Sequence, residues 1–166
     1  FETILDYIPA PEGDPDAGTQ VLISTIDYNE YVGRIGVGKV DNGSVKVNQE
    51  VMIVNHHEPD KMKKVKISKL YEFDGLNKVE IQEAGIGSIV AISGIADIHI
   101  GDTLCSVDNP APIPFQKISE PTIAMHFIVN DSPLAGQEGK YVTSRHLRDR
   151  LFRELNTDVS LRVEET

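Results

Sequence analysis

Short apolar-rich runs separated by turn signals fill residues 19–105, and they predict β-strands. Val, Ile and Tyr, which favour the pleated surface of a sheet, are in excess in these runs. The expected strands cover residues 21–28, 31–40, 50–55, 63–73, 88–93 and 102–105. An Asn42-Gly43 step predicts a hairpin turn after the second run, and glycines inside the runs indicate bulges or tight bends. Because no helix-length amphipathic segment interrupts them, the runs predict a closed antiparallel β-barrel.

A different pattern follows the barrel. Residues 122–129 are dense enough in apolar side chains for a buried strand, and residues 159–165 alternate as a strand does. Between them, Leu147, Leu151 and Leu155 have the spacing of one helix face, with Thr143 or Ser144 able to cap its first turn. This order is the opening half of a ferredoxin-like α/β (βαβ) unit. Half a unit leaves sheet edges uncovered, so we expect that the chain has been cut at Thr166.

The expected fold is therefore mainly β, a barrel followed by a partial α/β unit. Ile4 and Ile8 predict a short N-terminal helix that ends before Pro9, and residues 106–121 hold four of the nine prolines, typical of a semi-rigid connector. We divide the chain into a junction (1–12), a β-barrel domain (13–107), a Pro-rich linker (108–121) and a truncated α/β domain (122–166).

Known catalytic and metal-binding spacings are missing from the sequence. The five histidines and Cys105 do not have the spacing of metal ligands. The GQEGK run at 136–140 resembles the end of a phosphate-binding loop, but Tyr141 stands where that loop needs Ser or Thr. We therefore expect no catalytic residue, no metal site and no cofactor in this chain. The single thiol favours a reducing cytoplasmic compartment, and the apolar runs are too short for a membrane helix.

Charge is unevenly distributed along the chain. The net charge is −10, of which residues 1–112 carry −9 and residues 113–166 carry −1. Within the acidic part, one nine-residue stretch contains five lysines and no acid: Lys61, Lys63, Lys64, Lys66 and Lys69. If Val65 faces the core, strand alternation sends Lys64 and Lys66 outward together. The stretch is either a solvated strand face that protects a sheet edge or a contact patch for RNA phosphates, and both interpretations stay open.

A second basic cluster lies on and before the predicted C-terminal helix. Lys140, Arg145 and Arg148 are its candidates for contact with RNA or the ribosome. Arg145 and Arg148 are three residues apart and share one flank of the helix. An ordinary polar helix face explains this cluster equally well.

Three runs of the sequence resemble a known protein family. Residues 31–54 (YVGRIGVGKVDNGSVKVNQEVMIV) and 83–105 (EAGIGSIVAISGIADIHIGDTLC) are similar to the second, β-barrel domain of translational GTPases. The residues that follow resemble the third domain of the elongation-factor-G-like branch. Within that branch, residues 132–145 (SPLAGQEGKYVTSR) look like the TypA (BipA) family of ribosome-associated GTPases. The resemblance covers essentially the whole chain.

The resemblance implies a role in translation, ribosome assembly or stress adaptation. It implies that GTP and magnesium are bound by a GTPase domain outside this sequence, so the segment itself would be non-catalytic. Its expected partners are the ribosome, mainly the rRNA and proteins of the small subunit, and the GTPase and C-terminal domains of the longer protein, with no membrane. Two alternatives remain: an acidic barrel that binds proteins without an RNA role, and a chain that itself hydrolyses GTP.

Overall fold

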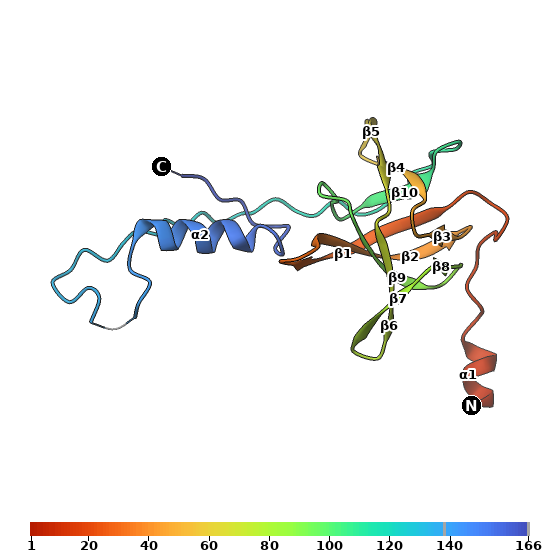
Figure 1. Ribbon diagram of the computed structural model, residues 1–166, viewed down its shortest axis with the longest axis horizontal. Helices are drawn as coiled ribbons and strands as arrows, with labels where there is room; N and C mark the ends of the chain where they lie inside the picture. The colour runs from red at the N-terminus through yellow and green to blue at the C-terminus, as the bar shows by residue number, and fades with distance from the viewer. Residues whose placement is uncertain (138, 166) are drawn as a thin grey trace. The chain divides into compact units, whose positions relative to one another are not determined.

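The computed structural model describes residues 1–137 and 139–165. Glu138 and Thr166 lie outside the described residues, so the expectation about the chain end at Thr166 is not addressed. The chain forms two compact units, and each is described by itself. They cover Phe1–Lys117 and Ile118–Thr166. The first unit contains every strand of the described chain and the second contains the longer helix (Figure 1).

The first unit is an antiparallel β-structure preceded by a short helix. The predicted N-terminal helix is present as α1 (Glu2–Tyr7). The strands are β1 (Gln20–Asn29), β2 (Gly33–Asn42), β3 (Val45–Lys46), β4 (Glu50–Asn55), β5 (Glu58–Lys66), β6 (Lys69–Asp74), β7 (Asn77–Ile81), β8 (Glu83–Ala84), β9 (Ile89–Ser93) and β10 (Asp102–Ser106). The main sheet has the order β5-β4-β10-β1-β2-β9-β6-β7, while β3 and β8 pair separately. The predicted mainly β fold is confirmed.

A bulge in β1 sets which residues of that strand face the core. The pairing of β1 with β2 shifts between Ile23 and Thr25, which inserts one extra residue into β1. Alternation would otherwise send Thr25 inward, but after the shift Ile26 is buried and Thr25 is exposed. Gly38 lies opposite Ile23, and a Cβ atom there would come within 2.2 Å of the Leu22 carbonyl oxygen. The close approach of the two strands therefore requires glycine at this position.

The core of the first unit is built from branched aliphatic side chains of nearly every strand. Its fully buried members of largest volume are Ile23, Ile67, Leu70, Ile92, Ile98 and Leu104. Ile98 belongs to the loop between β9 and β10, and Ile95 in the same loop is also buried. Burial of a whole aliphatic side chain stabilises a fold by about 1.5–3 kcal/mol. The 94–101 loop is thus anchored in the core at two points, and residues between these anchors are held in place.

The strand pairing differs from the sequence prediction in two places. The Asn42-Gly43 step does turn the chain, with Gly43 at φ 65°, but it does not close a hairpin: β3 pairs with β8, whereas β2 pairs with β1 and β9. The run expected at 63–73 is two strands, β5 and β6, broken at Ile67 and Ser68. Local turn chemistry identifies where a strand ends, whereas the partner of the next strand depends on the whole sheet.

The second unit contains α2 (Ser144–Glu154), with Thr143 as its N-cap. The Thr143 hydroxyl accepts a hydrogen bond from the His146 backbone N–H at 3.4 Å, as the sequence suggested. The strands predicted at 122–129 and 159–165 are not formed in the described residues. In a split βαβ unit a third strand lies between these two and supplies their hydrogen bonds, and no described segment takes that place. The helix is the part of the α/β prediction that is realised.

Candidate nucleic-acid interface

The lysine-rich stretch forms most of strand β5, which is an edge of the main sheet. Strand β5 pairs with β4 alone, and all of its residues except Val65 are exposed. Val65 is partly buried against the core, so the alternation predicted from the sequence holds near the end of the strand. Because alternate side chains of a strand leave it on opposite sides, the four lysines of β5 divide into two pairs.

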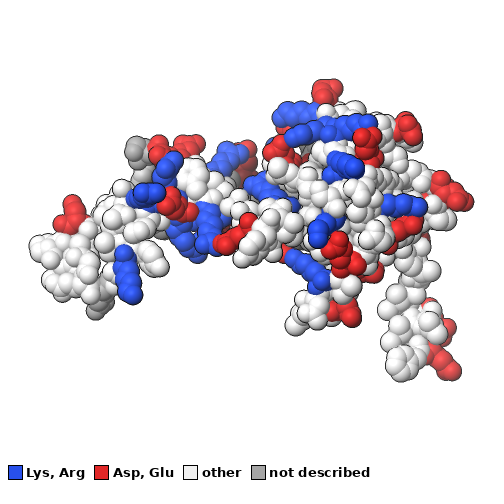
Figure 2. Space-filling view, in the orientation of Figure 1, with Lys and Arg blue, Asp and Glu red and all other residues white. Residues whose placement is uncertain are grey.

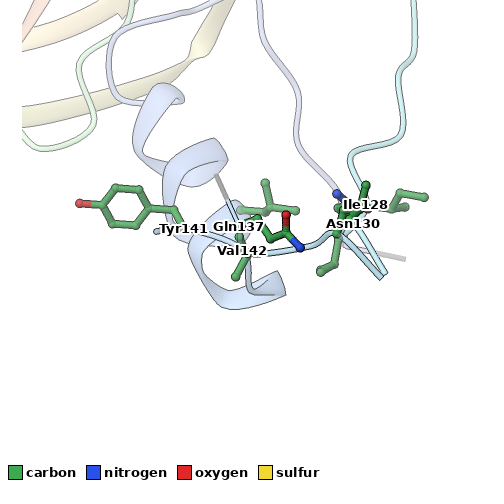
Figure 3. Close-up of a pocket in the computed structure, with 9 residues that line it drawn as sticks. Ile128, Asn130, Gln137, Tyr141 and Val142 are labelled. Atoms are coloured by element: carbon green, nitrogen blue, oxygen red, sulfur yellow. The ribbon is translucent and has the colours of Figure 1, made fainter. Parts of the chain in front are cut away.

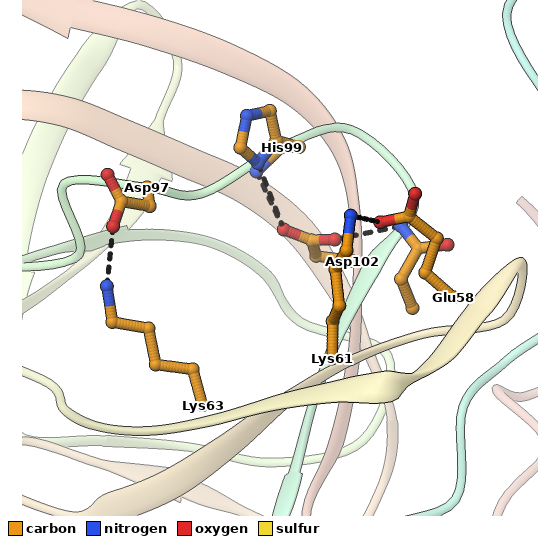
Figure 4. Close-up of polar contacts among 7 residues, drawn as sticks. Glu58, Lys61, Lys63, Asp97, His99 and Asp102 are labelled. Carbon is orange, nitrogen blue, oxygen red and sulfur yellow. Dashed lines mark hydrogen bonds and ion pairs between the residues drawn. The ribbon is translucent and has the colours of Figure 1, made fainter.

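The first pair, Lys61 and Lys63, lies on the side of β5 that faces the 94–101 loop (Figure 4). The Lys63 ammonium donates to an Asp97 carboxylate oxygen at 2.5 Å, and Lys61 pairs with Glu58 at 2.9 Å. The hydrogen bond from Lys63 holds the pKa of Asp97 below its usual value, and the positive charges of Lys63, His99 and Arg34 lower it further. Asp97 is thus the centre of a cationic environment on the barrel surface.

Asp102 anchors the end of the same loop. Its carboxylate is almost fully buried and accepts hydrogen bonds from the Asn55 side-chain amide at 2.9 Å and from the His99 backbone N–H at 2.8 Å. The His99 imidazole Nδ1 lies 3.7 Å from the same carboxylate (Figure 4). Its interaction with Asp102 raises the pKa of His99 above the ordinary value, because the negative charge stabilises the imidazolium. His99 therefore contributes a further positive charge beside Asp97 at mildly acidic pH.

The second pair, Lys64 and Lys66, lies on the opposite side of β5. Lys66 is directly across from Glu50 in the register with β4, and Lys64 reaches the Glu50 carboxylate at 2.6 Å. A hydrogen bond from Lys64 lowers the pKa of Glu50, and the nearby Lys66 charge adds to the shift. One carboxylate therefore stands between two lysines on this side.

Lys69 does not belong to the same surface as the other four. It is the first residue of β6, which pairs with β7 and β9, and its ammonium lies 3.0 Å from Glu80. The stretch that is continuous in sequence is therefore three separate cationic positions in the structure. Figure 2 shows the lysines and arginines of this face interspersed with acids, without a broad patch of one sign.

The helical cluster in the second unit is also paired with acids. Arg145 lies 4.0 Å from Asp149 one turn along α2, and Arg148 pairs with Glu165 while its guanidinium stacks over the Phe152 ring at 5.6 Å. Lys140 is exposed in the loop before the helix. Arg145 and Arg148 are on one helix, as predicted, and both remain exposed enough to contact a ligand.

A hollow of about 590 Å³ lies in the second unit (Figure 3). Its described lining is mainly aliphatic, and the side chains of Asn130, Gln137 and Tyr141 are its polar members. Gln137 comes from the GQEGK run that resembles a phosphate-binding loop. No Asp, Glu, His, Lys or Cys side chain is among its described lining residues. No group of three or more metal-ligating side chains occurs among the residues that the structure describes, and none of the helices there is long and apolar enough to span a membrane.

Comparison with known proteins gives the relationship of this chain. The family model for elongation factor Tu domain 2 matches residues 33–105. The large ribosomal subunit assembly factor BipA of Synechocystis is 52% identical over 99% of the chain, and BipA of Bacillus subtilis and of Escherichia coli K12 are 47% and 45% identical over all of it. The chain belongs to the BipA (TypA) family. It spans about a quarter of these relatives' length, 27% in each.

A solved structure also supports the fold. Translation elongation factor SelB from Methanococcus maripaludis, in its apo form, is similar with a TM-score of 0.51 and 20% identity over 65% of this chain and 22% of that chain. At this identity the likeness concerns the fold alone. Together with the elongation factor Tu domain 2 match, it identifies a translation-factor β-barrel, as the sequence resemblance implied.

The residues that surround the lysines on this surface are the ones that sequence reasoning missed. Glu58, Asp97 and His99 lie outside the lysine stretch, and no motif marks them as its partners. Asp102 was visible in the sequence as part of the run that resembles translation factors, but its role as a buried acceptor was not. Asp97 is 34 residues from Lys63 in sequence, and only the tertiary fold brings its loop near β5.

Proposed function

We propose that this chain is a non-catalytic ribosome-binding module of a BipA-family translational GTPase, and that it contacts rRNA through strand β5 with a smaller contribution from α2. The observation that carries the proposal is the identity of 45–52% along the chain with proteins named as ribosomal subunit assembly factors. A role in translation or ribosome assembly, in the cytoplasm, follows from this relationship. Nucleotide and magnesium chemistry is assigned to a GTPase domain of the longer protein.

The geometry of β5 supports RNA as the ligand. The strand is an exposed edge with a lysine at four of its last six positions, and its side chains are long enough to reach a phosphate backbone. Phosphate contacts by lysine supply the salt-dependent part of RNA affinity and need no base-specific geometry. The ion pairs at this strand are solvent-exposed, so water and salt screen them and a polyanion can compete for the lysines.

A salt titration of binding to purified ribosomal subunits tests the proposal. The variant Lys61→Gln, Lys63→Gln, Lys64→Gln, Lys66→Gln removes all four β5 lysines. We expect its affinity to fall at least about tenfold at about 100 mM salt, and the slope of log K against log salt to decrease by about 0.7–0.9 for each phosphate that the variant no longer neutralises. Binding measured separately to small and large subunits decides between the small subunit, expected from the resemblance, and the large subunit in the relatives' name.

The matched control carries the same change of charge elsewhere in the first unit: Lys39→Gln, Lys46→Gln, Lys78→Gln and Lys117→Gln. We expect this control to retain most of the affinity and nearly the full salt slope. An equal fall in affinity for the two variants would mean that net charge, and not β5, determines binding, and the site assignment would fail.

Two other functions give different results in the same preparation. A chain that hydrolyses GTP would release phosphate above the blank, whereas we expect none. A barrel that binds only proteins would keep its partner after nuclease treatment of a lysate and would show no subunit binding that depends on the β5 lysines. Its acidic surface, with a net charge of −9 over residues 1–112, is the feature that favours this second candidate.

A further inference from the structure

Asp97 occupies a rigid position in a cationic environment. It lies in the 94–101 loop between Ile95 and Ile98, which are both buried in the core, while its own side chain projects into solvent. The backbone N–H of Gly101 donates to the Ile23 carbonyl at 2.8 Å, and Asp102 ties the end of the loop to β4 through Asn55. The backbone that carries Asp97 is therefore held in place by packing and hydrogen bonds that do not involve Lys63, whereas its carboxylate is exposed.

Three positive groups act on this one carboxylate. Lys63 donates to it directly, and the charges of His99 and Arg34 also stabilise its ionised form. These groups come from β5, the 94–101 loop and β2, three segments far apart in sequence. A position that stabilises a carboxylate also stabilises a phosphate oxygen, because both are anionic hydrogen-bond acceptors.

We propose that Asp97 is an intramolecular counterion that occupies the place of an RNA phosphate, and that RNA binds the loop-facing side of β5 by displacing Asp97 from Lys63. This inference rests on the proposed function and adds two things to it: which side of β5 takes the RNA, and a residue that restrains binding. Glu58 has the same relationship to Lys61, at a sequence distance of three residues.

The exchange of one anion for another is feasible because the Lys63–Asp97 pair is exposed. Its two side chains keep 59% and 66% of their surface accessible, so solvent screens their attraction. RNA presents several phosphates at once, and each phosphate that a lysine neutralises releases a cation condensed on the RNA. Removal of the Asp97 charge should therefore strengthen RNA binding, since the ligand no longer competes with the carboxylate.

The opposite side of β5 provides an internal comparison. There, Glu50 lies between Lys64 and Lys66, but no residue corresponding to His99 or Arg34 acts on its pKa. Glu50 also belongs to β4 and pairs with Lys66 in the sheet register, whereas Asp97 comes from a separate loop. Asp97 is thus anchored independently of β5, and this difference selects the loop-facing side.

The test measures binding of a fluorescently labelled RNA hairpin to the whole chain at low salt. Asp97→Asn should bind about two- to fivefold more tightly than the wild type, the range expected for one exposed ion pair. Its salt slope should stay close to that of the wild type, because Lys63 neutralises a phosphate in both complexes. Asp97→Glu, which keeps the charge, should bind like the wild type.

Two matched controls carry the same charge change. Asp27→Asn breaks the pair with Lys78 on β7, and Glu50→Gln breaks the pair with Lys64 on the other side of β5. Both should raise affinity less than Asp97→Asn does. If Asp27→Asn raises RNA affinity as much as Asp97→Asn does, the change in net charge alone explains the effect. If Glu50→Gln raises it as much, the choice of the loop-facing side is wrong.

A double-mutant cycle establishes whether Asp97 acts through Lys63. In the Lys63→Gln background, Asp97→Asn should no longer improve binding, because the lysine that it releases is absent. A gain that persists in that background overturns the proposal. The two proposals fail differently: wild-type chain that does not bind RNA contradicts the RNA-binding function, whereas wild-type chain that binds, with Asp97→Asn no better than its controls, contradicts only the counterion role.

Discussion

The two compact units of this chain have comparable apolar patterns and very different burial. In the first unit, alternating runs pair into a sheet and place side chains such as Leu70 and Ile92 completely out of solvent. In the second unit, residues 122–129 are as apolar as any strand of the barrel, yet Ile123, Phe127 and Ile128 remain 61–83% exposed. No described residue of the second unit is fully buried. An apolar pattern therefore produces a strand only where backbone partners are present to complete its hydrogen bonds.

The difference in burial between the two units is tested most strongly by replacing one leucine in each unit with alanine. Leu70→Ala creates a cavity in the packed core and should destabilise the first unit by about 2–5 kcal/mol. Leu147→Ala removes a half-buried side chain from α2 and should change the barrel's free energy of unfolding by less than about 0.5 kcal/mol, since α2 belongs to the other unit and sites without shared partners act independently. Urea denaturation followed by circular dichroism measures both. A comparable destabilisation in the two variants would show that the units unfold as one.

A smaller loss of stability is expected from a change at Gly101, which precedes β10 and contacts Phe115. Gly101 has φ 88°, and a Cβ atom there would lie 2.0 Å from the Phe115 ring. Gly101→Ala should cost about 1–3 kcal/mol, from the left-handed backbone and the displaced ring. Gly75→Ala is the control, because Gly75 has φ 61° but nothing within 4 Å of its Cβ position, and it should cost about 1–2 kcal/mol. If the two variants unfold at the same urea concentration, the contact with Phe115 does not matter.

The smallest effect is the pH dependence contributed by His99. Its pKa is raised in the folded state by Asp102, so the folded protein binds the proton more tightly than the unfolded chain does. The resulting stability is fully present below the unfolded value of about 6.5 and is lost as pH rises through the folded pKa. Because the side chain is largely exposed, we expect less than about 1 kcal/mol. The stability difference between wild type and His99→Gln should be larger at acidic pH than at alkaline pH; the reverse order would contradict the Asp102 contact.

Sequence reasoning identified the barrel because its information is local. Apolar alternation in β1, β4, β9 and β10 and the turn at Gly43 are properties of short segments, and the prediction of strands there is confirmed. It could not identify that β3 pairs with β8, since nothing in two residues of strand encodes a partner about forty residues away. The missed strands, β3, β7 and β8, are short, and each contains polar side chains, so their alternation carries little signal.

The candidate site was predicted only as a set of lysines. Spacing along the chain placed Lys63, Lys64 and Lys66 on a strand with Lys64 and Lys66 pointing outward together, and the exposure of these two in β5 agrees with that. Spacing could not identify the acids on either side, include Lys61 in the same strand, or assign Lys69 to a different strand. The separation depends on where β5 ends and on which loop lies beside it, which are tertiary features.

The amino-acid sequence by itself determined the mainly β character of this protein, the helix at its C-terminal end, its family and the lysine-rich strand. Each of these follows from the order of residue types in short segments, or from similarity along them. Only the tertiary structure decided the sheet order, the side of β5 on which each lysine lies and the meeting of Lys63, Asp97 and His99. The physical reason is that hydrogen-bonded strand pairing and core packing bring together residues that have no relationship in sequence, and the charges on the surface follow the backbone that carries them.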